Sequence, residues 1–489
     1  MKNFFIRTFR LEGMTVGLAA IIIALLGLMW AAYKGWSVIL VAPVFALVAA
    51  LGSDHSLMPT FSELYMTKAA EYFKSYYAVF LFGAVFAKIM EKGGLAASIA
   101  NKMINALGPE RAIMAVILTS GVLVYGGLNV FVAAFVMYPF GAYIFKKADI
   151  PKRLLPSALW IGIFTFSMVS LPGTPQIQNI IPATYFGTNT WSGMGIGIFA
   201  SVLYLVTGWG WLTYRAGYLK KKGEGYGLDR NDVELTDGRA SATLPDWKLS
   251  VLPMVMVVVL NVILSNPFNW NWGYHWDPNA LDSFKGLHIA LLVGAVSKVQ
   301  GVWSITIALA LSTLVAAWVG RKRCMANGGI LAEVNNGAVS SCSAILNVCS
   351  GFAFGSVVTS LAGFEVIKNA LIAVGSSTNP LVSVVLTSDI MVAITGSASS
   401  AMTIALSMLG NQWAQMAAAT GIPLDVFHRI VAVSSIGIDP VPQCGAWVTM
   451  LAICGLTHKE SYGDVFVLLG IKFFIPFVCI LFYMLTGIA

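Results

Sequence analysis

Long apolar runs recur along the whole sequence and constrain the fold more than any other feature. The 489 residues are 57% hydrophobic and only 11% charged, whereas a water-soluble protein of this length needs a more charged surface. A helix needs about 20 mainly apolar residues to span a bilayer, so we predict an all-α polytopic membrane protein with about 10 to 12 transmembrane helices. Runs that approach this length are Val16–Ala32, Ala112–Val124, Val130–Phe145, Ile196–Thr213, Val251–Leu264, Ile305–Val319 and Val465–Leu485.

Basic residues between the apolar runs indicate how the chain is oriented. Cytoplasmic loops of membrane proteins carry an excess of Lys and Arg, and such residues cluster at 146–153, 220–222 and 321–323. We expect these three segments in the cytoplasm and the Trp-rich segment 266–282 at the outer headgroup region. The net charge of +8 then reflects membrane topology, so no nucleic-acid partner is expected.

One stretch inside this apolar chain cannot form a continuous helix. Residues 171–179 read LPGTPQIQN, with two prolines, a glycine and three amides. Non-helical backbone and unpaired amides each cost several kcal/mol in hydrocarbon, so they persist only against protein or beside a wet cavity. The basic clusters on either side also require an even number of full crossings between them. We therefore predict that the stretch is re-entrant or unwound and forms half of a binding site.

Three landmarks occur twice in the same order, which indicates an internal repeat. Each copy has a Gly-x-x-Phe sequence, then a glycine break in an apolar run, then a proline-split polar segment. Their separations are 43 and 46 residues in the first copy, and 45 and 44 in the second. The landmarks are Gly83–Phe86, Gly126–Gly127 and Pro172–Pro175, matched by Gly351–Phe354, Thr395–Ser397 and Asp439–Pro442.

Such a repeat predicts the domain organisation. In membrane proteins with two inverted repeats, broken helices in corresponding positions hold a ligand near the bilayer midplane. We expect that architecture here, with residues 1–214 as the first membrane repeat, 215–248 as a polar cytoplasmic linker and 249–489 as the second membrane repeat.

The breaks offer chemistry suited to a small organic anion. Helix N-termini exposed at a break present unpaired N–H groups and the positive end of the helix dipole. Glycines let the backbone approach a ligand, while hydroxyls and amides can bond its oxygens. The alternative is that the small residues only allow close helix packing. The candidate substrate-binding residues are Gly126, Gly127, Asn129, Gly173, Thr174, Gln176, Gln178, Asn179, Thr395, Gly396, Ser397, Ser399, Ser400 and Gln443.

Acidic residues within the membrane segments are candidates for ion coupling, because they are costly there and usually functional. Asp439 and Asp389 could accept a coupling proton, since burial favours the uncharged carboxyl. Asn379 lies in a segment rich in hydroxyls and amides that suits a sodium ion. The simpler alternative for Asp439 and Asn379 is a helix cap. His428 and Arg429 are expected in a loop, without a chemical role.

Other function classes find little support in the sequence. It has no Gly-x-x-x-x-Gly-Lys-Ser/Thr phosphate loop and no His-Glu-x-x-His motif, which mark ATP-driven pumps and metalloproteases. The six cysteines lie mostly in apolar segments and lack metal-site spacing, so we expect no disulfide and no zinc site. An enzyme is therefore not expected. An anion channel stays open, because polar breaks also line pores.

Several of these motifs resemble the gluconate permease family, part of the wider ion-transporter superfamily. The likeness covers nearly the whole chain and is strongest in the segments 171–182 (LPGTPQIQNIIP), 187–190, 394–400 (ITGSASS), 435–442 and 455–462 (GLTHKESY). Two positions depart from the family pattern: Gln443 stands where a histidine is expected, and Asp389 where an amide is commoner. The resemblance implies two inverted repeats, hairpins that dip into the membrane, an elevator-like motion and often a homodimer.

The resemblance and the residues together predict a function. We expect a secondary active symporter in the cell (inner) membrane that imports a small hydroxy- or sugar-acid carboxylate, such as gluconate or hydroxybutyrate. Coupling to protons by alternating access is expected, without a cofactor; sodium coupling is the alternative. The expected partners are the carboxylate substrate, the lipid bilayer and a second copy of the chain.

Overall fold

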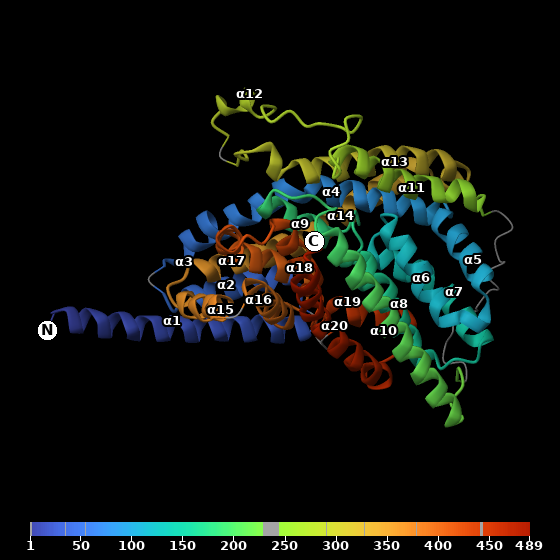
Figure 1. Ribbon diagram of the computed structural model, residues 1–489, viewed down its shortest axis with the longest axis horizontal. Coiled ribbons are helices and arrows are strands. Elements are labelled where there is room, and N and C mark those ends of the chain that lie inside the picture. Colours follow the sequence, from blue (N-terminus) through green and yellow to red (C-terminus); the bar gives the residue numbers. More distant parts are fainter. Residues whose placement is uncertain are drawn as a thin grey trace.

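The computed structural model describes residues 2–34, 36–53, 55–227, 244–289, 291–326, 328–377, 379–440 and 444–489. All regular secondary structure in these ranges is helical, which confirms the predicted fold class (Figure 1). Eight of the described helices are long and apolar enough to cross a bilayer, and a pair bent by 96°, Leu95–Leu107 with Pro109–Tyr125, would make a ninth. Shorter apolar stretches of 10 to 17 helical residues are Val16–Ala31, which is part of a longer helix, Val38–Ala50, Pro380–Ala393 and Gly445–Cys454.

Seven helices occur twice in the same order and with similar lengths. The first set is α4 (Met66–Lys92), α5 (Leu95–Leu107), α6 (Ala112–Tyr125), α7 (Val130–Lys147), α8 (Leu155–Phe164), α9 (Ile177–Phe186) and α10 (Met194–Lys221). The second is α14 (Ile330–Ser360), α15 (Phe364–Ser377), α16 (Pro380–Thr395), α17 (Ala398–Thr420), α18 (Leu424–Ser434), α19 (Gly445–Cys454) and α20 (His458–Thr486). The three sequence landmarks of each copy fall in corresponding places: within α4 or α14, after α6 or α16, and before α9 or α19.

Two pairs of corresponding helices, α4 with α14 and α10 with α20, run antiparallel. The hydroxyl of Tyr65, just before α4, donates to the carbonyl oxygen of Ser350 in the second half of α14 (3.2 Å). In the same way, Phe199 near the start of α10 stacks on Phe482 near the end of α20. Arg215 near the end of α10 pairs with Asp464 near the start of α20 (2.7 Å). Two repeats of opposite orientation would have this arrangement.

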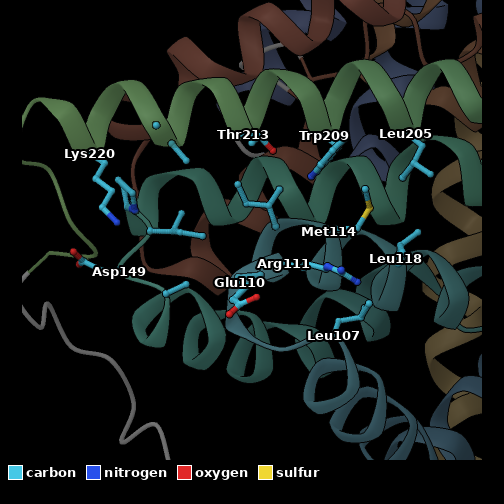
Figure 2. A pocket seen from close by; sticks show the side chains of 17 residues that line it. Leu107, Glu110, Arg111, Met114, Leu118, Asp149, Leu205, Trp209, Thr213 and Lys220 are labelled. Atoms are coloured by element: carbon cyan, nitrogen blue, oxygen red, sulfur yellow. The ribbon is translucent and has the colours of Figure 1, made fainter.

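Each set contains a helical hairpin, and the two hairpins enter from opposite sides. The α6–α7 hairpin starts beside the basic loop after α7, and both line one groove (Figure 2). The α16–α17 hairpin starts beside the end of α20, where the Asn379 amide contacts the sulfur of Met484 (3.4 Å). The first arms, α6 and α16, have 14 and 16 residues and end at glycines inside the protein, at Gly126 and at Gly396 with φ +61°. The second arms, α7 and α17, have 18 and 23 residues.

The remaining helices flank the two sets. α11 (Trp247–Ser265) and α13 (Gln300–Ala326) pack on each other and α13 packs on α4, while α1 (Lys2–Tyr33) packs on α2 (Val38–Ala50). Between α11 and α13 the chain makes a long excursion that carries α12 (Asp282–Lys285), at the top of Figure 1. Shorter elements are α3 (Leu57–Pro59), the π-helical turns Thr60–Tyr65 and Phe166–Ser170, and the 3-10 turns Pro109–Arg111, Lys152–Leu154 and Val296–Lys298.

The two basic loops on either side of residues 171–179, here called the first break, meet on one side of the protein. Arg153 pairs with Glu224 (3.0 Å), and the Asp149 carboxylate accepts the backbone N–H of Tyr226 (3.0 Å). The chain between them crosses and returns, as an even number of crossings requires. α10 continues to Lys221, so the predicted linker 215–248 begins within a helix. Residues 228–243 of that linker lie outside the described residues, and the division into 1–214, 215–248 and 249–489 stays a prediction.

We expect cysteines placed at residues 222 and 272 to lie on opposite sides of the membrane. In a variant without the native cysteines, Trp272→Cys should react with a membrane-impermeant maleimide in intact cells, whereas Lys222→Cys should react only after permeabilisation. Labelling of both in intact cells would contradict the assigned topology.

Candidate functional site

At the first break, backbone N–H and C=O groups that cannot form helix hydrogen bonds find partners within the protein. Pro172 and Pro175 lack N–H groups and interrupt the helix, and Gly173 takes a positive φ of +78°. The Gly173 N–H donates to the carbonyl oxygen of Thr190 (2.9 Å). The Thr174 hydroxyl donates to the carbonyl oxygen of Ser167 (2.6 Å), so this candidate ligand-binding residue holds the turn.

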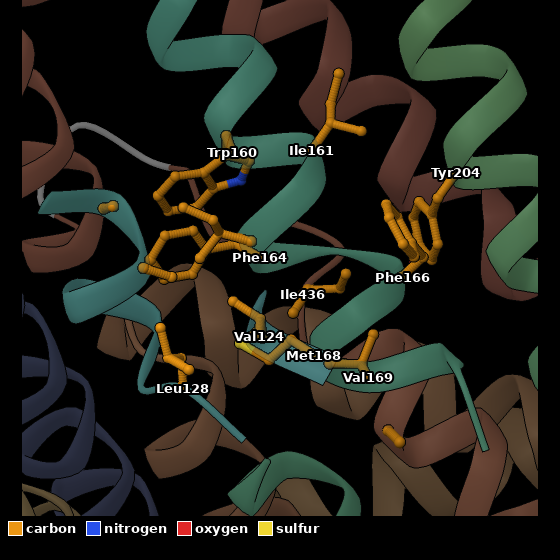
Figure 3. Close-up of a cluster of buried hydrophobic side chains, with 14 of the residues drawn as sticks. Val124, Leu128, Trp160, Ile161, Phe164, Phe166, Met168, Val169, Tyr204 and Ile436 are labelled. Atoms are coloured by element: carbon orange, nitrogen blue, oxygen red, sulfur yellow. The ribbon is translucent and has the colours of Figure 1, made fainter. Parts of the chain in front are cut away.

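Gln176 joins the first break to the tip of the α6–α7 hairpin. Its amide donates to the carbonyl oxygens of Val124 (2.9 Å) and Leu128 (3.1 Å), and the Tyr125 hydroxyl donates to that of Pro172 (2.8 Å). Val124 and Leu128 belong to the same apolar cluster as Trp160 and Phe164 of α8, whose rings stack at 4.1 Å. Figure 3 shows this packing, which fixes the tip against α8.

Glycine and asparagine shape that tip. A Cβ on Gly126 would overlap Met254 of α11, and Gly127 has a φ of +99°. The Asn129 side chain accepts the N–H of Phe131 (3.0 Å) and caps α7. The structure thus brings Gly126, Gly127 and Asn129 together with Gln176, as two adjoining parts of one region.

A buried arginine from the second set closes the first break. Arg429 of α18 is fully buried. Its Nε and Nη2 donate to Ser192 O (3.0 and 2.7 Å), and Nη2 also to Thr190 O (3.3 Å). Its Nη1 donates to Val169 O (3.0 Å) and to the side-chain oxygen of Asn179 (2.9 Å). The guanidinium thus ties Val169 on one side of the break to Asn179 of α9 and to the carbonyls of Thr190 and Ser192, which lie between α9 and α10.

Sequence reasoning placed His428 and Arg429 in a loop, and this was wrong. Both are buried in α18. The sequence signal was an arginine inside the apolar run 426–433. Asp425, one turn earlier, interacts electrostatically with Arg429, but Arg429 forms no ion pair with a carboxylate among the described residues. The first break therefore has a buried positive charge next to it that makes no direct ion pair with a described carboxylate.

The amides of the first break divide into two kinds. Asn179 is fully buried; its amide donates to the carbonyl oxygens of Thr174 (3.1 Å) and Thr190 (2.7 Å), so it is structural. Gln178 is half-buried, and its side chain makes no hydrogen bond to any described residue. The hydroxyls of Ser399 and Ser400 on α17 are likewise unbonded within the described part of the chain. Gln178, Ser399 and Ser400 are thus the predicted residues that are free to contact a ligand.

The other residues predicted for the second half have local roles or lie outside the described part. The Thr395 hydroxyl donates to the carbonyl oxygen of Met391 (2.9 Å), and the Ser397 side chain caps α17. Asn379 caps α16 by accepting the N–H of Leu381 (2.9 Å). Gln443 lies outside the described residues.

Two acids and a lysine meet at the corresponding segment before α19, which begins at Asp439 and is here called the second break. Asp439 forms a buried ion pair with Lys472 of α20. Asp389 of α16 is 2% exposed, and neither carboxylate oxygen has a hydrogen-bond partner among the described residues. The Gly437 backbone lies so close to this carboxylate that a Cβ would overlap it. Lys472 also interacts electrostatically with Asp389.

Sequence reasoning missed Lys472. Its signal was a lysine in the middle of the apolar run 465–485, where an unpaired charge is costly. The Lys472 ammonium lies 5.4 Å from the centre of the Trp160 ring of α8, and that ring packs edge-on against Trp447 of α19 (5.3 Å). One lysine thus faces two acids, so the second break has a surplus negative charge when all three are ionised.

Comparison with known proteins identifies the family. The model of the GntP family permease matches residues 14–486. The chain belongs to this family. It is 37% identical over 480 residues to the uncharacterized transporter YxjC of Bacillus subtilis (strain 168), with 96% of this chain and 99% of that one covered. The permease is therefore a multi-pass transporter of the cell (inner) membrane and not an enzyme.

Two solved structures share the fold of the permease at low sequence identity. The YdaH transporter of Alcanivorax borkumensis, described as having an unusual topology, matches with a TM-score of 0.56 at 14% identity, covering 95% of this chain and 98% of that one. MtrF of Neisseria gonorrhoeae, from a class of antimetabolite efflux pumps, matches with a TM-score of 0.52 at 14% identity, covering 94% of each chain. At this identity the likeness shows the fold alone.

Replacing Gly173 with alanine should destabilise the permease more than the same change at Gly223. Both glycines have a φ of +78°, but a Cβ on Gly173 would overlap the Trp191 ring, whereas nothing lies within 4 Å at Gly223. Backbone strain of about 1–2 kcal/mol is then common to both variants, while Gly173→Ala adds an overpacking cost of about 1–3 kcal/mol.

Thermal unfolding of the purified variants in detergent measures the difference. We expect Gly173→Ala to unfold several degrees below Gly223→Ala. Equal unfolding temperatures would show that the packing around Trp191 is not tight.

Proposed function

We propose that this permease is a secondary active symporter that imports a small hydroxy- or sugar-acid anion together with protons. Gluconate and hydroxybutyrate represent the substrate class, because each has a carboxylate and a hydroxyl. The family and the transporter relative support transport of a small molecule. The choice of anion and of proton is our proposal and is supported by the charges at the two breaks.

The observation that carries the proposal is the opposite charge of the two breaks. The first has the buried Arg429 cation beside it, without an ion-pair partner among the described carboxylates. The second has Asp389 and Asp439 against the single Lys472. In a low-dielectric interior such charges attract ligands of opposite sign strongly. The first break thus suits an anion and the second a cation.

Donors at the first break suit a carboxylate. The α9 helix begins at Ile177, so the positive end of its dipole lies at this break. Gln178, in the first turn of α9, has an amide free to donate. Arg429 contributes positive potential without contacting the ligand, since its donors are occupied by carbonyl oxygens. Ser399 and Ser400 offer hydroxyls for the substrate hydroxyl group.

Asp389 is the residue best placed to take the coupling proton. An ionised carboxylate without hydrogen-bond donors is costly when buried, and protonation removes that cost. Asp439 is less available, because Lys472 already neutralises it. Sodium is the alternative, since the free carboxylate oxygens of Asp389 could also coordinate a metal cation.

The hairpins suggest how access alternates. One enters from the basic side and the other from the opposite side, and each ends at a break. We infer that the two sets are inverted repeats, that the hairpins gate opposite entrances, and that an elevator-like motion in a homodimer carries the site across. A channel is the second candidate, since polar breaks also line pores. Uphill accumulation in proteoliposomes distinguishes the symporter, because a channel passes only downhill flux.

Gln178→Ala should lower substrate uptake by about 10-fold or more, because a hydrogen bond to a charged group contributes about 1.5–3 kcal/mol. The same change at the exposed Gln415 of α17 should leave uptake unchanged. Uptake of a labelled hydroxy acid by proteoliposomes measures the effect, and competition by a panel of hydroxy acids identifies the preferred anion. Wild-type uptake by Gln178→Ala would remove this residue from the site.

Asp389→Asn should abolish accumulation driven by an imposed proton gradient but retain exchange of labelled for unlabelled substrate. Exchange needs the moving site but no net proton transfer, so it serves as the internal control. The exposed Asp282→Asn variant should behave like the wild type. Full wild-type accumulation driven by sodium alone, with a protonophore present, would overturn the choice of proton.

A further inference from the structure

A buried tyrosine of α4 has a hydroxyl group that the fold leaves without a partner. Tyr72 is 2% exposed, and its ring packs against Tyr76 of the same helix (4.6 Å between ring centres) and Phe352 of α14 (5.4 Å). Its hydroxyl has no hydrogen-bond partner among the described residues. A buried tyrosine hydroxyl usually has one, because an unpaired buried donor is costly. Packing therefore accounts for the ring of Tyr72 but not for its hydroxyl.

The packing of α9 on α17 shows where this hydroxyl lies relative to the first break. The Tyr185 ring of α9 lies 3.3 Å from the position of a Cβ on Gly410 of α17. Phe186, the last residue of α9, contacts Phe427 of α18 (6.3 Å between ring centres), and α18 follows directly after α17 in the chain. Both helices therefore end on the same side of the protein and run side by side in the same direction.

Counting back from this contact brings Gln178 and Thr403 to one level. Gln178 is seven residues before Tyr185, and Thr403 is seven residues before Gly410. Seven residues make about two turns, so each pair shares one face of its helix, and both helices descend by about 10 Å over that length. Gln178 and Thr403 therefore lie at the same depth on the facing sides of α9 and α17.

Tyr72 reaches this level from α4. Its hydroxyl lies beside the Thr403 side chain without forming a hydrogen bond to it; the Thr403 hydroxyl instead donates to the carbonyl oxygen of Ser399 (2.6 Å). Ser399 and Ser400 are four and three residues before Thr403, so they lie one turn away on the same face of α17. The Tyr72 hydroxyl thus lies next to the three predicted residues that are free to contact a ligand, Gln178, Ser399 and Ser400.

The face of α9 that meets this hydroxyl is partly accessible. Gln178 and Tyr185 are half-buried, whereas Asn179, Ala183 and Phe186 on the other side of the helix are buried. Tyr185 also has a hydroxyl without a hydrogen bond to any described residue. A small molecule bound at Gln178 is therefore within reach of donors that the protein itself does not use.

We propose that the Tyr72 hydroxyl donates a hydrogen bond to the hydroxyl group of the transported acid, and that this bond makes the permease select hydroxy acids over unsubstituted acids. The inference rests on the proposed function, in which the carboxylate lies at Gln178 and the start of α9. An acid without a hydroxyl gains no such bond, and a site built to bond a substrate hydroxyl discriminates strongly against the analogue that lacks it. Tyr72 is then a specificity-determining residue outside both breaks.

Thermal stabilisation of the purified full-length permease by added ligand tests the proposal, because it measures binding without transport. Hydroxybutyrate and butyrate are the probes, since they differ by one hydroxyl group. We expect the wild type to bind hydroxybutyrate at least 10-fold more tightly than butyrate. Tyr72→Phe, which keeps the ring, should weaken the binding of hydroxybutyrate about 10-fold and leave that of butyrate unchanged, so that the preference is lost.

Tyr76→Phe is the matched control. Tyr76 lies one turn further along α4, and its hydroxyl already pairs with that of Thr184 (2.9 Å), so this variant should keep the preference for hydroxybutyrate. The unfolding temperatures without ligand separate folding from binding. Tyr72→Phe loses no hydrogen bond and should unfold no lower than the wild type, whereas Tyr76→Phe should unfold below it.

Other outcomes would overturn the proposal. Equal binding of the two acids by the wild type, or an unchanged preference in Tyr72→Phe, would show that the Tyr72 hydroxyl does not contact the ligand, while the proposed function would stand. An equal loss of preference in Tyr76→Phe would show a general effect of packing around α4. If neither hydroxybutyrate nor gluconate stabilises the wild type, the proposed substrate class is wrong and the role of Tyr72 falls with it.

Discussion

The rest of this structure depends on one buried guanidinium, that of Arg429, which donates hydrogen bonds to several backbone carbonyls. A helix broken at mid-membrane leaves carbonyl groups without partners, each of which is costly away from water. Arg429 is suited to satisfy them, since its planar fork of five N–H donors reaches several acceptors at once and stays charged. The same contact that makes the break stable thus provides its positive potential. Stability and anion attraction have one source here.

The two halves use one architecture for different chemistry. Arg429 and Trp160 are each the sixth residue of their helices, α18 and α8, and each reaches across to the third residue of α9 or α19, Asn179 or Trp447. The contact between α18 and α9 is polar, whereas the contact between α8 and α19 is aromatic. Lys472, the fifteenth residue of α20, corresponds to Gly208 of α10, which packs against Ile161. Substitutions at equivalent positions therefore place a cation beside one break and an acid–base cluster beside the other.

Much of this could be predicted from sequence, because it depends on local chemistry. Apolar runs indicate membrane helices, and Pro, Gly and Ser mark where the helices break, as at Pro172 and Gly396. What could not be predicted depends on contacts between distant segments. Thr174 and Asn179 look like ligand-binding residues in sequence, but their polar atoms are occupied by protein partners. The burial of Arg429 could not be predicted, because the acceptors of its hydrogen bonds lie 237 to 260 positions earlier in the chain.

The distance in sequence between the first break and its clamp has a consequence for biosynthesis. Asn179 and Arg429 are separated by 250 residues, and chains grow at about 5–20 residues per second, so about 12 to 50 seconds pass before the clamp is made. During that time the carbonyls of the first break have no guanidinium to bind. Until α18 has been synthesised, the first break is held only by hydrogen bonds within the first half, such as those from Gly173 and Asn179 to the carbonyl oxygen of Thr190.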